Sequence, residues 1–415
     1  MVQLQLSSSS KKSSAPIVLL VVVLVLVLIV TISIIVTSSM NVSPHGPSSQ
    51  KQWTLIGTTP INMTGTFHEN LGAIDCLTTK ECVASGNDQV GGFEYGIITT
   101  NVTTYPKWST VTLPPGVGPI SSISCTSLSS CVAVGSAPVV PHGVELPYIA
   151  NGHFPPGVIL SGNLITGVWQ MDKLPPDLSY IKSVSCSGSY CVATGLTQEY
   201  GGIILEESES NSWHEVSTKG LHGLDQGGVG VSCVSSGFCM FGGDTSDPYI
   251  LVSNNFGRTW SQENPGGIWG DPVFTLTCQS STMCLAVGGA SPGGVAGFTT
   301  FLLNSSDGGN SWSNVSLPTP TKPPAKNGIP QSSLNEGNLA SVSCLSSQVC
   351  MAGGMRGDGY GLIVATSDGK NWASVSLPTN TGNIAGVSCS AVNTCVVLAN
   401  TFTTGALFSA TYQLK

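Results

Sequence analysis

The chain has 415 residues, of which only 9% are charged and 50 are glycines, and its formal net charge is −8. This composition favours a turn-rich all-β fold, and no convincing helical stripe follows the N-terminal region. Arg258 and Arg356 are the only arginines in the sequence. Binding to phosphate backbones requires clustered lysine and arginine, so nucleic acid is excluded as an expected partner.

The N-terminal region carries a membrane-anchor signal. Residues 17–36 form a run of twenty that is apolar except for Thr31 and Ser33, about the length of a membrane-spanning helix. Lys11 and Lys12 precede this run, and positive charge favours the cytoplasmic side. A cleaved signal peptide is the alternative, and it would make the chain secreted. We predict a single-pass protein of the cell membrane with a cytoplasmic tail (1–14), a transmembrane signal anchor (15–37), a flexible stalk (38–51) and an extracytoplasmic folded part (52–415).

All fourteen cysteines fall into seven closely spaced pairs. Most pairs follow a short Ser/Val/Ile run and precede a second apolar run, which is the pattern of strand, tight turn and strand. Exported proteins meet oxidising conditions, and a metal site would need Cys-x-x-Cys or mixed Cys/His clusters. We therefore predict disulfides and no metal or other cofactor. The predicted bridges are Cys76–Cys82, Cys125–Cys131, Cys186–Cys191, Cys233–Cys239, Cys278–Cys284, Cys344–Cys350 and Cys389–Cys395.

A second element alternates with the cysteine hairpins: an apolar strand, a polar turn and a tryptophan. Each unit thus has four strands, named A to D here, in which A and B form the cysteine hairpin, C is the apolar run and D carries the tryptophan. The last unit has no D strand, whereas residues 53–60, ahead of the first cysteine pair, resemble the D segment at residues 372–378. The D strand missing from the last unit is thus present at the start of the chain. This arrangement predicts a seven-bladed β-propeller whose last blade is completed by the N-terminal strand, and not an open solenoid. The tryptophans after the C strands are Trp108, Trp169, Trp213, Trp260, Trp312 and Trp372.

Three of the predicted C–D turns share a motif. Residues 305–312 read Ser-Ser-Asp-Gly-Gly-Asn-Ser-Trp, residues 366–372 give a version shorter by one residue, and residues 253–260 carry Asn255 in place of the aspartate. The motif is similar to the Asp box, in which the acid accepts backbone N–H bonds of its own turn and a glycine takes a positive φ. The chain from Trp53 onward therefore resembles the Asp-box (BNR-repeat) β-propellers, a group that includes sialidases, the sortilin ectodomain and photosystem II assembly factors. The predicted box residues are Ser305, Asp307, Gly309, Trp312, Ser367, Asp368, Gly369 and Trp372.

The resemblance implies an architecture without sialidase activity. A sialidase would require three arginines around the substrate carboxylate, a Tyr/Glu nucleophile pair and an acidic proton donor, and lysine does not reproduce bidentate recognition by guanidinium. The chain has two arginines, and Arg258 lies inside a box turn. The basic patch that photosystem assembly factors would use is also missing. We therefore expect a binding module without catalysis.

A catalytic alternative stays open, because a glycoside hydrolase or lyase needs only two suitably spaced carboxylates. A simpler interpretation is that each candidate acid caps a turn or faces solvent. The acidic run at residues 206–209 is interpreted as a charged strand edge that discourages aggregation. A third hypothesis is an assembly factor for a membrane complex. The candidate acids for hydrolysis are Glu145, Asp244, Asp247, Asp271 and Asp358.

The longest predicted loops lie on one face. In an antiparallel blade the A–B and C–D turns share one face, named the turn face here, and the B–C and D–A loops share the opposite loop face. The insertions at 136–156, 266–273, 289–297 and 318–338 all belong to the loop face, and binding residues are commonly held on loops over a rigid scaffold. We predict that the loop face binds a protein or a glycan; the alternative is that its loops are tolerated insertions. The candidate contact residues are Tyr148, His153, Trp269, Asp271, Arg356, Asp358 and Tyr360.

Overall fold

The computed structural model describes residues 51–61, 70–90, 92–138, 154–199, 201–209, 211–219, 221, 230–242, 250–263, 273–289, 300–318, 337–391, 393–402 and 406–415. The chain divides into two units, Met1–Gln50 and Lys51–Lys415. The predicted tail, the signal anchor and all of the stalk except Lys51 lie outside the described residues. Among the residues that are described, no helix has the length and hydropathy needed to span a bilayer.

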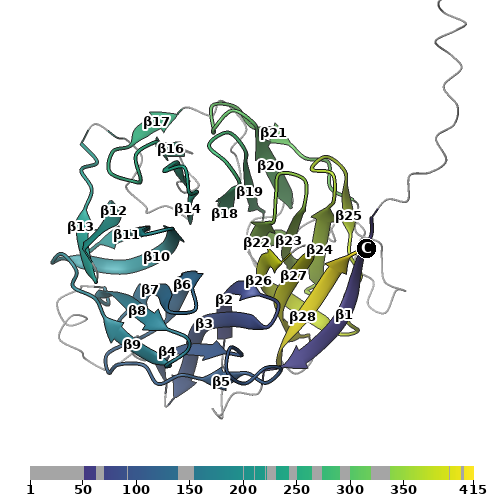
Figure 1. Cartoon of the computed structure of the whole chain (residues 1–415), viewed down its shortest axis with the longest axis horizontal. Coiled ribbons are helices and arrows are strands. Elements are labelled where there is room, and N and C mark those ends of the chain that lie inside the picture. Colours follow the sequence, from purple (N-terminus) through teal and green to yellow (C-terminus); the bar gives the residue numbers. More distant parts are fainter. Residues whose placement is uncertain are drawn as a thin grey trace, which may run out of the picture. The chain divides into compact units, whose positions relative to one another are not determined.

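The unit from Lys51 to Lys415 is a seven-bladed β-propeller. Its strands form seven four-stranded sheets set around a common centre (Figure 1). From strand A to strand D, blade 1 contains β2 (Asn70–Thr78), β3 (Glu81–Val90), β4 (Phe93–Thr100) and β5 (Ser109–Thr110); blade 2 contains β6 (Ile120–Ser127), β7 (Ser130–Ser136), β8 (Gly157–Asn163) and β9 (Val168–Met171). Blade 3 contains β10 (Leu178–Ser187), β11 (Tyr190–Thr197), β12 (Gly202–Glu209) and β13 (Ser212–Glu215); blade 4 contains β14 (Gly230–Cys233), β15 (Cys239–Gly242), β16 (Ile250–Ser253) and β17 (Ser261–Glu263). Blade 5 contains β18 (Val273–Cys278), β19 (Cys284–Gly288), β20 (Phe301–Ser305) and β21 (Ser313–Asn314); blade 6 contains β22 (Asn338–Cys344), β23 (Cys350–Met355), β24 (Gly361–Thr366) and β25 (Trp372–Ser374). Blade 7 contains β26 (Thr381–Ala391), β27 (Thr394–Thr401), β28 (Leu407–Leu414) and β1 (Trp53–Pro60).

The middle strands of the blades are the most apolar. Every position of β15, β16 and β24 is buried, because a neighbouring blade covers each face of the sheet and alternation between an inner and an outer face is lost. The D strands of blades 1 to 6 are short; in β25 only Trp372 is buried, and the two residues after it are exposed. The core therefore lies in layers between the blades.

The N-terminal strand closes the ring, as predicted from the sequence. Strand β1 pairs with β28 in antiparallel register from Trp53 opposite Leu414 to Pro60 opposite Phe408. Gln52 and Lys415 extend the pairing by exchanging two backbone hydrogen bonds of 3.0 and 3.1 Å. Closure leaves no long sheet edge unpaired between the first and the last blade.

All seven predicted disulfides are present. Each bridge joins strands A and B of one blade directly across the hairpin, with Cα atoms 4.0 to 4.1 Å apart. The paired cysteines are also register partners in the sheets, as with Cys233 and Cys239 in blade 4. A bridge of this kind braces its own hairpin and does not connect one blade to another.

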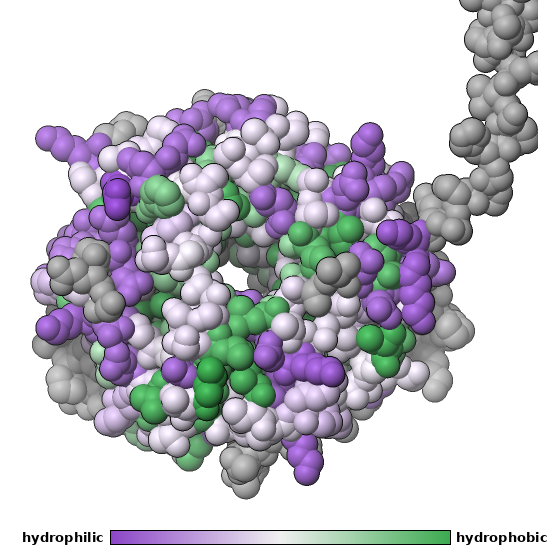
Figure 2. All heavy atoms as spheres, viewed as in Figure 1, coloured by the Kyte–Doolittle hydropathy of each residue, from purple (hydrophilic) through white to green (hydrophobic). Residues whose placement is uncertain are grey.

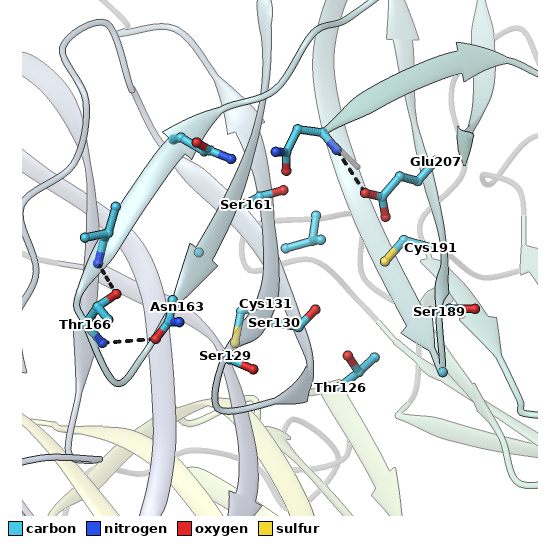
Figure 3. Close-up of a pocket in the computed structure, with 16 residues that line it drawn as sticks. Thr126, Ser129, Ser130, Cys131, Ser161, Asn163, Thr166, Ser189, Cys191 and Glu207 are labelled. Carbon is cyan, nitrogen blue, oxygen red and sulfur yellow. Dashed lines mark hydrogen bonds between the residues drawn. The ribbon is translucent and has the colours of Figure 1, made fainter. Parts of the chain in front are cut away.

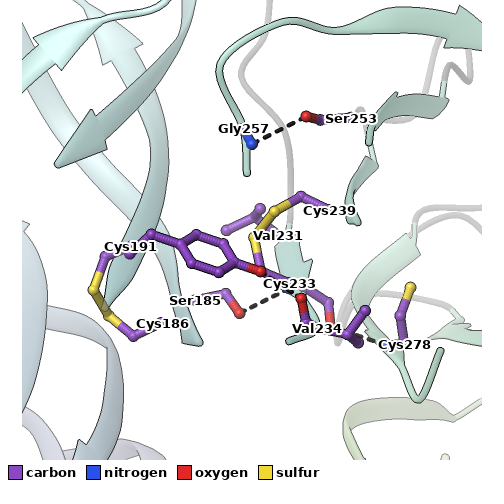
Figure 4. The surroundings of a disulfide bond; sticks show 12 residues. Ser185, Cys186, Cys191, Val231, Cys233, Val234, Cys239, Ser253, Gly257 and Cys278 are labelled. Carbon is purple, nitrogen blue, oxygen red and sulfur yellow. Dashed lines mark hydrogen bonds between the residues drawn. A yellow bond between two sulfur atoms is a disulfide. The ribbon is translucent and has the colours of Figure 1, made fainter. Parts of the chain in front are cut away.

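At the centre, five interfaces between neighbouring blades use the serine that precedes the first cysteine of a pair. Ser185 Oγ accepts a hydrogen bond of 2.9 Å from the backbone N–H of Cys233 in the next blade, and Figure 4 shows this bond beside the Cys186–Cys191 bridge. The same bond recurs with lengths of 2.9 to 3.0 Å in four further interfaces, between the pairs Ser124/Cys186, Ser232/Cys278, Ser343/Cys389 and Ser388/Cys76. The recurring Ser-Cys dipeptide thus supplies the acceptor that satisfies a backbone donor of the neighbouring blade.

The D-strand tryptophans connect the blades near the rim. Trp169 of blade 2 packs with Val83 and Ile98 of blade 1, and Trp53 packs with Ile363 of blade 6. Trp53, Trp108, Trp169, Trp213, Trp312 and Trp372 are all buried, with 3% to 8% of their surface exposed. Each ring contributes a large apolar contact to the preceding blade, as the sequence predicts for this position.

Candidate functional site

The loop face of blade 6 brings together the three described contact candidates. Arg356, Asp358 and Tyr360 lie in the connection between β23 and β24, which is a B–C loop. The backbone N–H of Arg356 donates to the carbonyl of Tyr360 at 2.8 Å, so the connection is a tight turn. The other predicted contact residues, Tyr148, His153, Trp269 and Asp271, lie outside the described residues.

Arg356 and Asp358 form a two-pronged ion pair. Arg356 Nε lies 3.0 Å from Asp358 Oδ1, and Arg356 Nη2 lies 2.5 Å from Asp358 Oδ2. The two side chains are only 15% and 5% exposed. A bidentate guanidinium–carboxylate pair of this kind holds the turn in place. Both carboxylate oxygens of Asp358, one of the candidate acids for hydrolysis, are thus in contact with Arg356.

Phe402 completes the cluster from the neighbouring blade. The residue directly follows β27 of blade 7, and its ring stacks on Tyr360 with centroids 4.3 Å apart and planes 17° apart. The guanidinium carbon of Arg356 lies 5.7 Å from the centre of the Tyr360 ring. Tyr360 and Phe402 remain 38% and 46% exposed. We name these four residues, Arg356, Asp358, Tyr360 and Phe402, the aromatic platform.

A glycine makes the stacking possible. Gly359 has a φ of +84°, and a Cβ at this position would lie 2.7 Å from the Phe402 ring. Phe402 is also held by its own backbone, since its N–H donates to the carbonyl of Asn380 at 2.8 Å. The platform thus combines a largely buried ion pair with two partly exposed rings on the loop face.

The loop face of blade 1 carries further exposed apolar side chains. At the start of β4, next to the B–C hairpin, the rings of Phe93 and Tyr95 lie 6.2 Å apart, centroid to centroid. Tyr95 is 43% exposed, and Val90 at the end of β3 is 55% exposed. Aromatic residues therefore occur on the loop face of blades 6, 7 and 1, which are consecutive in the ring.

On the turn face, several C–D turns are capped by hydrogen bonds to their own side chains. In blade 5, Asp307 Oδ1 accepts hydrogen bonds of 2.9 Å from the Ser305 hydroxyl and the Ser311 N–H, and Oδ2 accepts one of 2.5 Å from the Ser311 hydroxyl. The hydroxyl and the N–H of Ser311, with a smaller effect of Ser305, hold the pKa of Asp307 below its usual value. Gly309 N–H in turn donates to Ser305 Oγ at 2.9 Å. Asn255 makes the same contacts in blade 4, accepting from Ser253 and Thr259 at 3.0 Å each.

The shorter turn of blade 6 differs by one residue from the sequence prediction. Thr366, and not Ser367, supplies the hydroxyl: its Oγ1 donates to Asp368 Oδ1 at 3.0 Å and accepts from the N–H of Gly369 at 3.0 Å. Ser367 Oγ instead lies 3.5 Å from the carbonyl of Lys51. Backbone and side-chain donors of Asn371 lower the pKa of Asp368. The acid therefore caps the turn, and its role is structural.

A polar cleft of about 580 Å³ opens on the turn face between blades 2 and 3 (Figure 3). Glu207 is half-buried at its side, and burial raises the pKa of this carboxyl. Asp172 contacts Ser161, a residue of the lining. It accepts hydrogen bonds from the Ser161 hydroxyl at 2.8 Å and from the Trp213 indole at 3.0 Å. This cleft was not predicted from the sequence, because the acidic run at residues 206–209 has the pattern of a charged, solvent-exposed strand edge.

The centre of the ring is open and weakly charged. Figure 2 shows a hole through the middle of the propeller, around which the A strands lie. In the described A strands, Asp75 and Lys182 are the only residues of the types Asp, Glu, Lys and Arg. Most of the other residues are Ser, Thr, Gly or apolar. Burial raises the pKa of Asp75 to about 6. The described A strands hold no pair of carboxylates at the channel.

Comparisons with known proteins show the fold. No protein-family model matches the sequence, and no curated protein matches it. Among solved structures, YCF48 bound to a D1 peptide is 12% identical with a TM-score of 0.53, covering 90% of this chain and 98% of that one. A GH74 xyloglucanase from Xanthomonas campestris is 13% identical with a TM-score of 0.55, covering 86% of this chain and 55% of that one. Virginiamycin B lyase from Staphylococcus aureus, in an inactive variant with quinupristin, is 10% identical with a TM-score of 0.56, covering 88% and 100%. At such identities the likeness establishes a β-propeller fold, and fold does not imply function.

Proposed function

We propose that this protein is a membrane-anchored, extracytoplasmic binding module that recognises a protein or glycan through its loop face, without catalysis. The observation that carries the proposal is the aromatic platform. Tyr360 and Phe402 come from different blades, stack on each other and keep about two fifths of their surfaces exposed. Rigid, partly exposed aromatic rings next to an arginine are typical of the residues that dominate binding energies.

Three further observations support the proposal. The seven disulfides fit an oxidising, extracytoplasmic location. The apolar run at residues 17–36 fits a signal anchor that tethers the propeller. The side-chain caps of the turn face fit a relationship to Asp-box propellers, whose boxes are structural. The similar structure of YCF48 was solved with a bound peptide, which makes a protein segment the favoured ligand.

The test uses the full chain purified in detergent and immobilised, with the envelope fraction of the source organism as the probe. Wild type is compared with Tyr360→Ala and with Ile165→Ala, an exposed apolar residue (57%) in a C–D turn on the opposite face. We expect Tyr360→Ala to weaken capture of the bound species by about tenfold or more, as for an interface hot spot, and Ile165→Ala to leave it unchanged. Equal capture by wild type and Tyr360→Ala would contradict the proposal.

The same experiment separates the two ligand classes. One portion of the envelope fraction is digested with protease, and another is oxidised with periodate to destroy sugars. Loss of capture after protease alone identifies a protein ligand, and loss after periodate alone identifies a glycan.

Catalysis receives no support from the residues that the structure describes. Of the acids considered for a glycoside hydrolase or lyase, Asp358 is paired with Arg356. Glu145, Asp244, Asp247 and Asp271 lie outside the described residues. The hydrolase alternative therefore stays a prediction, and no observation here favours it over binding.

A further inference from the structure

The cleft between blades 2 and 3 opens where the turn of an Asp box would otherwise lie. In blade 4 the box glycine Gly257 is so close to blade 3 that a Cβ would lie 2.4 Å from Val192 Cγ2. In blade 5, Gly309 approaches Met240 of blade 4 in the same way, at 2.7 Å. Val192 and Met240 each follow the second cysteine of their blade, and the corresponding residue of blade 2 is Val132.

Blade 3 has no box glycine to cover Val132. The acidic run at residues 206–209 is instead the end of β12, and the C–D turn that follows includes Asn211, whose φ is +65°. Asn211 N–H donates to Glu207 Oε1 at 3.2 Å, which folds the turn back on itself. Val132, although only 5% exposed, is among the residues that line the cleft. Glu207 lines it from the facing blade (Figure 3).

Most of the side chains that line the cleft can form hydrogen bonds. Amide side chains come from Asn163, Gln170 and Asn211, and hydroxyl groups come from both blades, including Ser161 and Ser189. The volume of about 580 Å³ falls within the range of ligand pockets. Among the described residues, no aromatic ring lines the cleft. The lining is thus suited to a hydrophilic ligand with several hydroxyl groups.

Two carboxylates give the cleft a negative charge. Burial raises the pKa of both Glu207 and Asp172, and the charge of Asp172 raises that of Glu207 further. The ion pair found in the described part of the chain is Arg356–Asp358, so neither of these acids is paired with a basic residue there. Asp172 Oδ1 is buried and has no hydrogen-bond partner. Partly desolvated carboxylates with spare acceptors favour a cationic donor.

We propose that this cleft is a second binding site, which takes a protonated amino sugar. The ammonium group would lie against Glu207, with Asp172 adding to the field from behind Ser161, and the sugar hydroxyls would bond to the amides and hydroxyls of the lining. A metal ion fits less well, because no group of three or more candidate ligands occurs in the described residues. The site lies on the turn face and is independent of the aromatic platform.

The test measures binding of the glucosamine disaccharide to the full chain in detergent by titration calorimetry at neutral pH. Its di-N-acetylated form is the matched ligand, since it keeps the hydroxyls and loses both charges. The variants are Glu207→Gln, which keeps an acceptor for Asn211 N–H, and Glu215→Gln, which removes an exposed acid of β13 outside the cleft lining.

We expect wild type and Glu215→Gln to bind the disaccharide equally, and the acetylated form or Glu207→Gln to bind about tenfold or more weakly, as loss of a charge-assisted hydrogen bond would produce. Val168→Lys, at an exposed rim position (63%), places a competing ammonium group at the cleft and should weaken binding without altering the carboxylates. Equal affinity for both disaccharides, or unchanged binding by Glu207→Gln and Val168→Lys, would overturn the proposal, as would no binding by wild type.

Discussion

Asp75 Oδ2 accepts a hydrogen bond of 2.7 Å from the backbone N–H of Cys125, and this bond joins blade 1 to blade 2. Other blades use a serine hydroxyl for the same contact, as Ser185 does toward Cys233. Asp75 is therefore a carboxylate at a position where the other blades mostly have a neutral side chain. Burial raises the pKa of Asp75 to about 6.

The stability contribution of Asp75 should depend on pH in a defined direction. In the unfolded chain an aspartate has a pKa of about 3.9, whereas the folded value is about 6. The folded state thus binds the proton of Asp75 more strongly than the unfolded state does. The stabilisation that results is fully present below about pH 4 and is lost as the pH rises through about 6. Asp75→Asn keeps an acceptor for Cys125 N–H but cannot ionise.

The measurement is the free energy of unfolding by denaturant for both proteins from pH 4 to 8. We expect the difference, Asp75→Asn minus wild type, to become more positive between about pH 4 and 6 and to be level above that range. A difference that does not change with pH would show that Asp75 carries no raised pKa in the folded protein.

Removal of a serine acceptor at the inner ring should destabilise the propeller. Ser232 Oγ accepts the N–H of Cys278 at 2.9 Å, and both residues are buried or nearly so. Ser232→Ala leaves that N–H without its partner, and we expect a loss of about 1–3 kcal/mol in the free energy of unfolding. Ser374→Ala, at an exposed position of β25, is the control and should change stability by less than about 0.5 kcal/mol. Identical unfolding midpoints for the two variants would rule out a stabilising role for this bond.

The turn caps of the turn face should accept asparagine in place of aspartate. Asp307 accepts from Ser305 and Ser311, and Asn255 makes the equivalent contacts in blade 4. We expect Asp307→Ala to lower the free energy of unfolding by about 1 kcal/mol, and Asp307→Asn to lower it by clearly less. Thermal denaturation at neutral pH compares them, and an equal loss in both variants would mean that the side-chain oxygen does not cap the turn.

Each disulfide should act on its own blade. The Cys389–Cys395 bridge closes a short loop, with a sequence separation of 6, for which chain entropy predicts a stabilisation of about 2 kcal/mol. The double variant Cys389→Ala with Cys395→Ala should therefore fold, unfold cooperatively and lose about that amount. Denaturant unfolding followed by tryptophan fluorescence tests this, and a chain that no longer forms a cooperative fold would show that the bridge does more than brace its hairpin.

The ring and its bridges could be predicted from the sequence because their signals recur from repeat to repeat. Cysteine spacing fixes a hairpin within each repeat, and the likeness of the Trp53 segment to the Trp372 segment identifies the closing strand. The stack of Tyr360 on Phe402 could not be predicted in this way, because it depends on the rotation between blades 6 and 7. The prediction placed the hydroxyl of the blade 6 turn at Ser367, whereas it belongs to Thr366, two residues before the acid, as Ser305 lies two residues before Asp307.

The cleft was missed for a related reason. Glu207 belongs to an acidic run whose pattern is that of a solvated edge, and its burial results from the neighbouring blade. The predicted contact residues Arg356, Asp358 and Tyr360 do lie together, but their role in binding is a proposal. Contacts that form between neighbouring blades therefore cannot be predicted from the pattern of a single repeat.

The most direct test of the proposed binding surface is a double-mutant cycle with Tyr360→Ala and Phe402→Ala, measured as the apparent affinity of the full chain for the envelope species that wild type captures. Because each ring supports the other, we expect both single variants to bind about tenfold more weakly, and the double variant to bind little more weakly than either. Wild-type affinity in all three variants would contradict the account and remove the loop face of blades 6 and 7 as the binding surface.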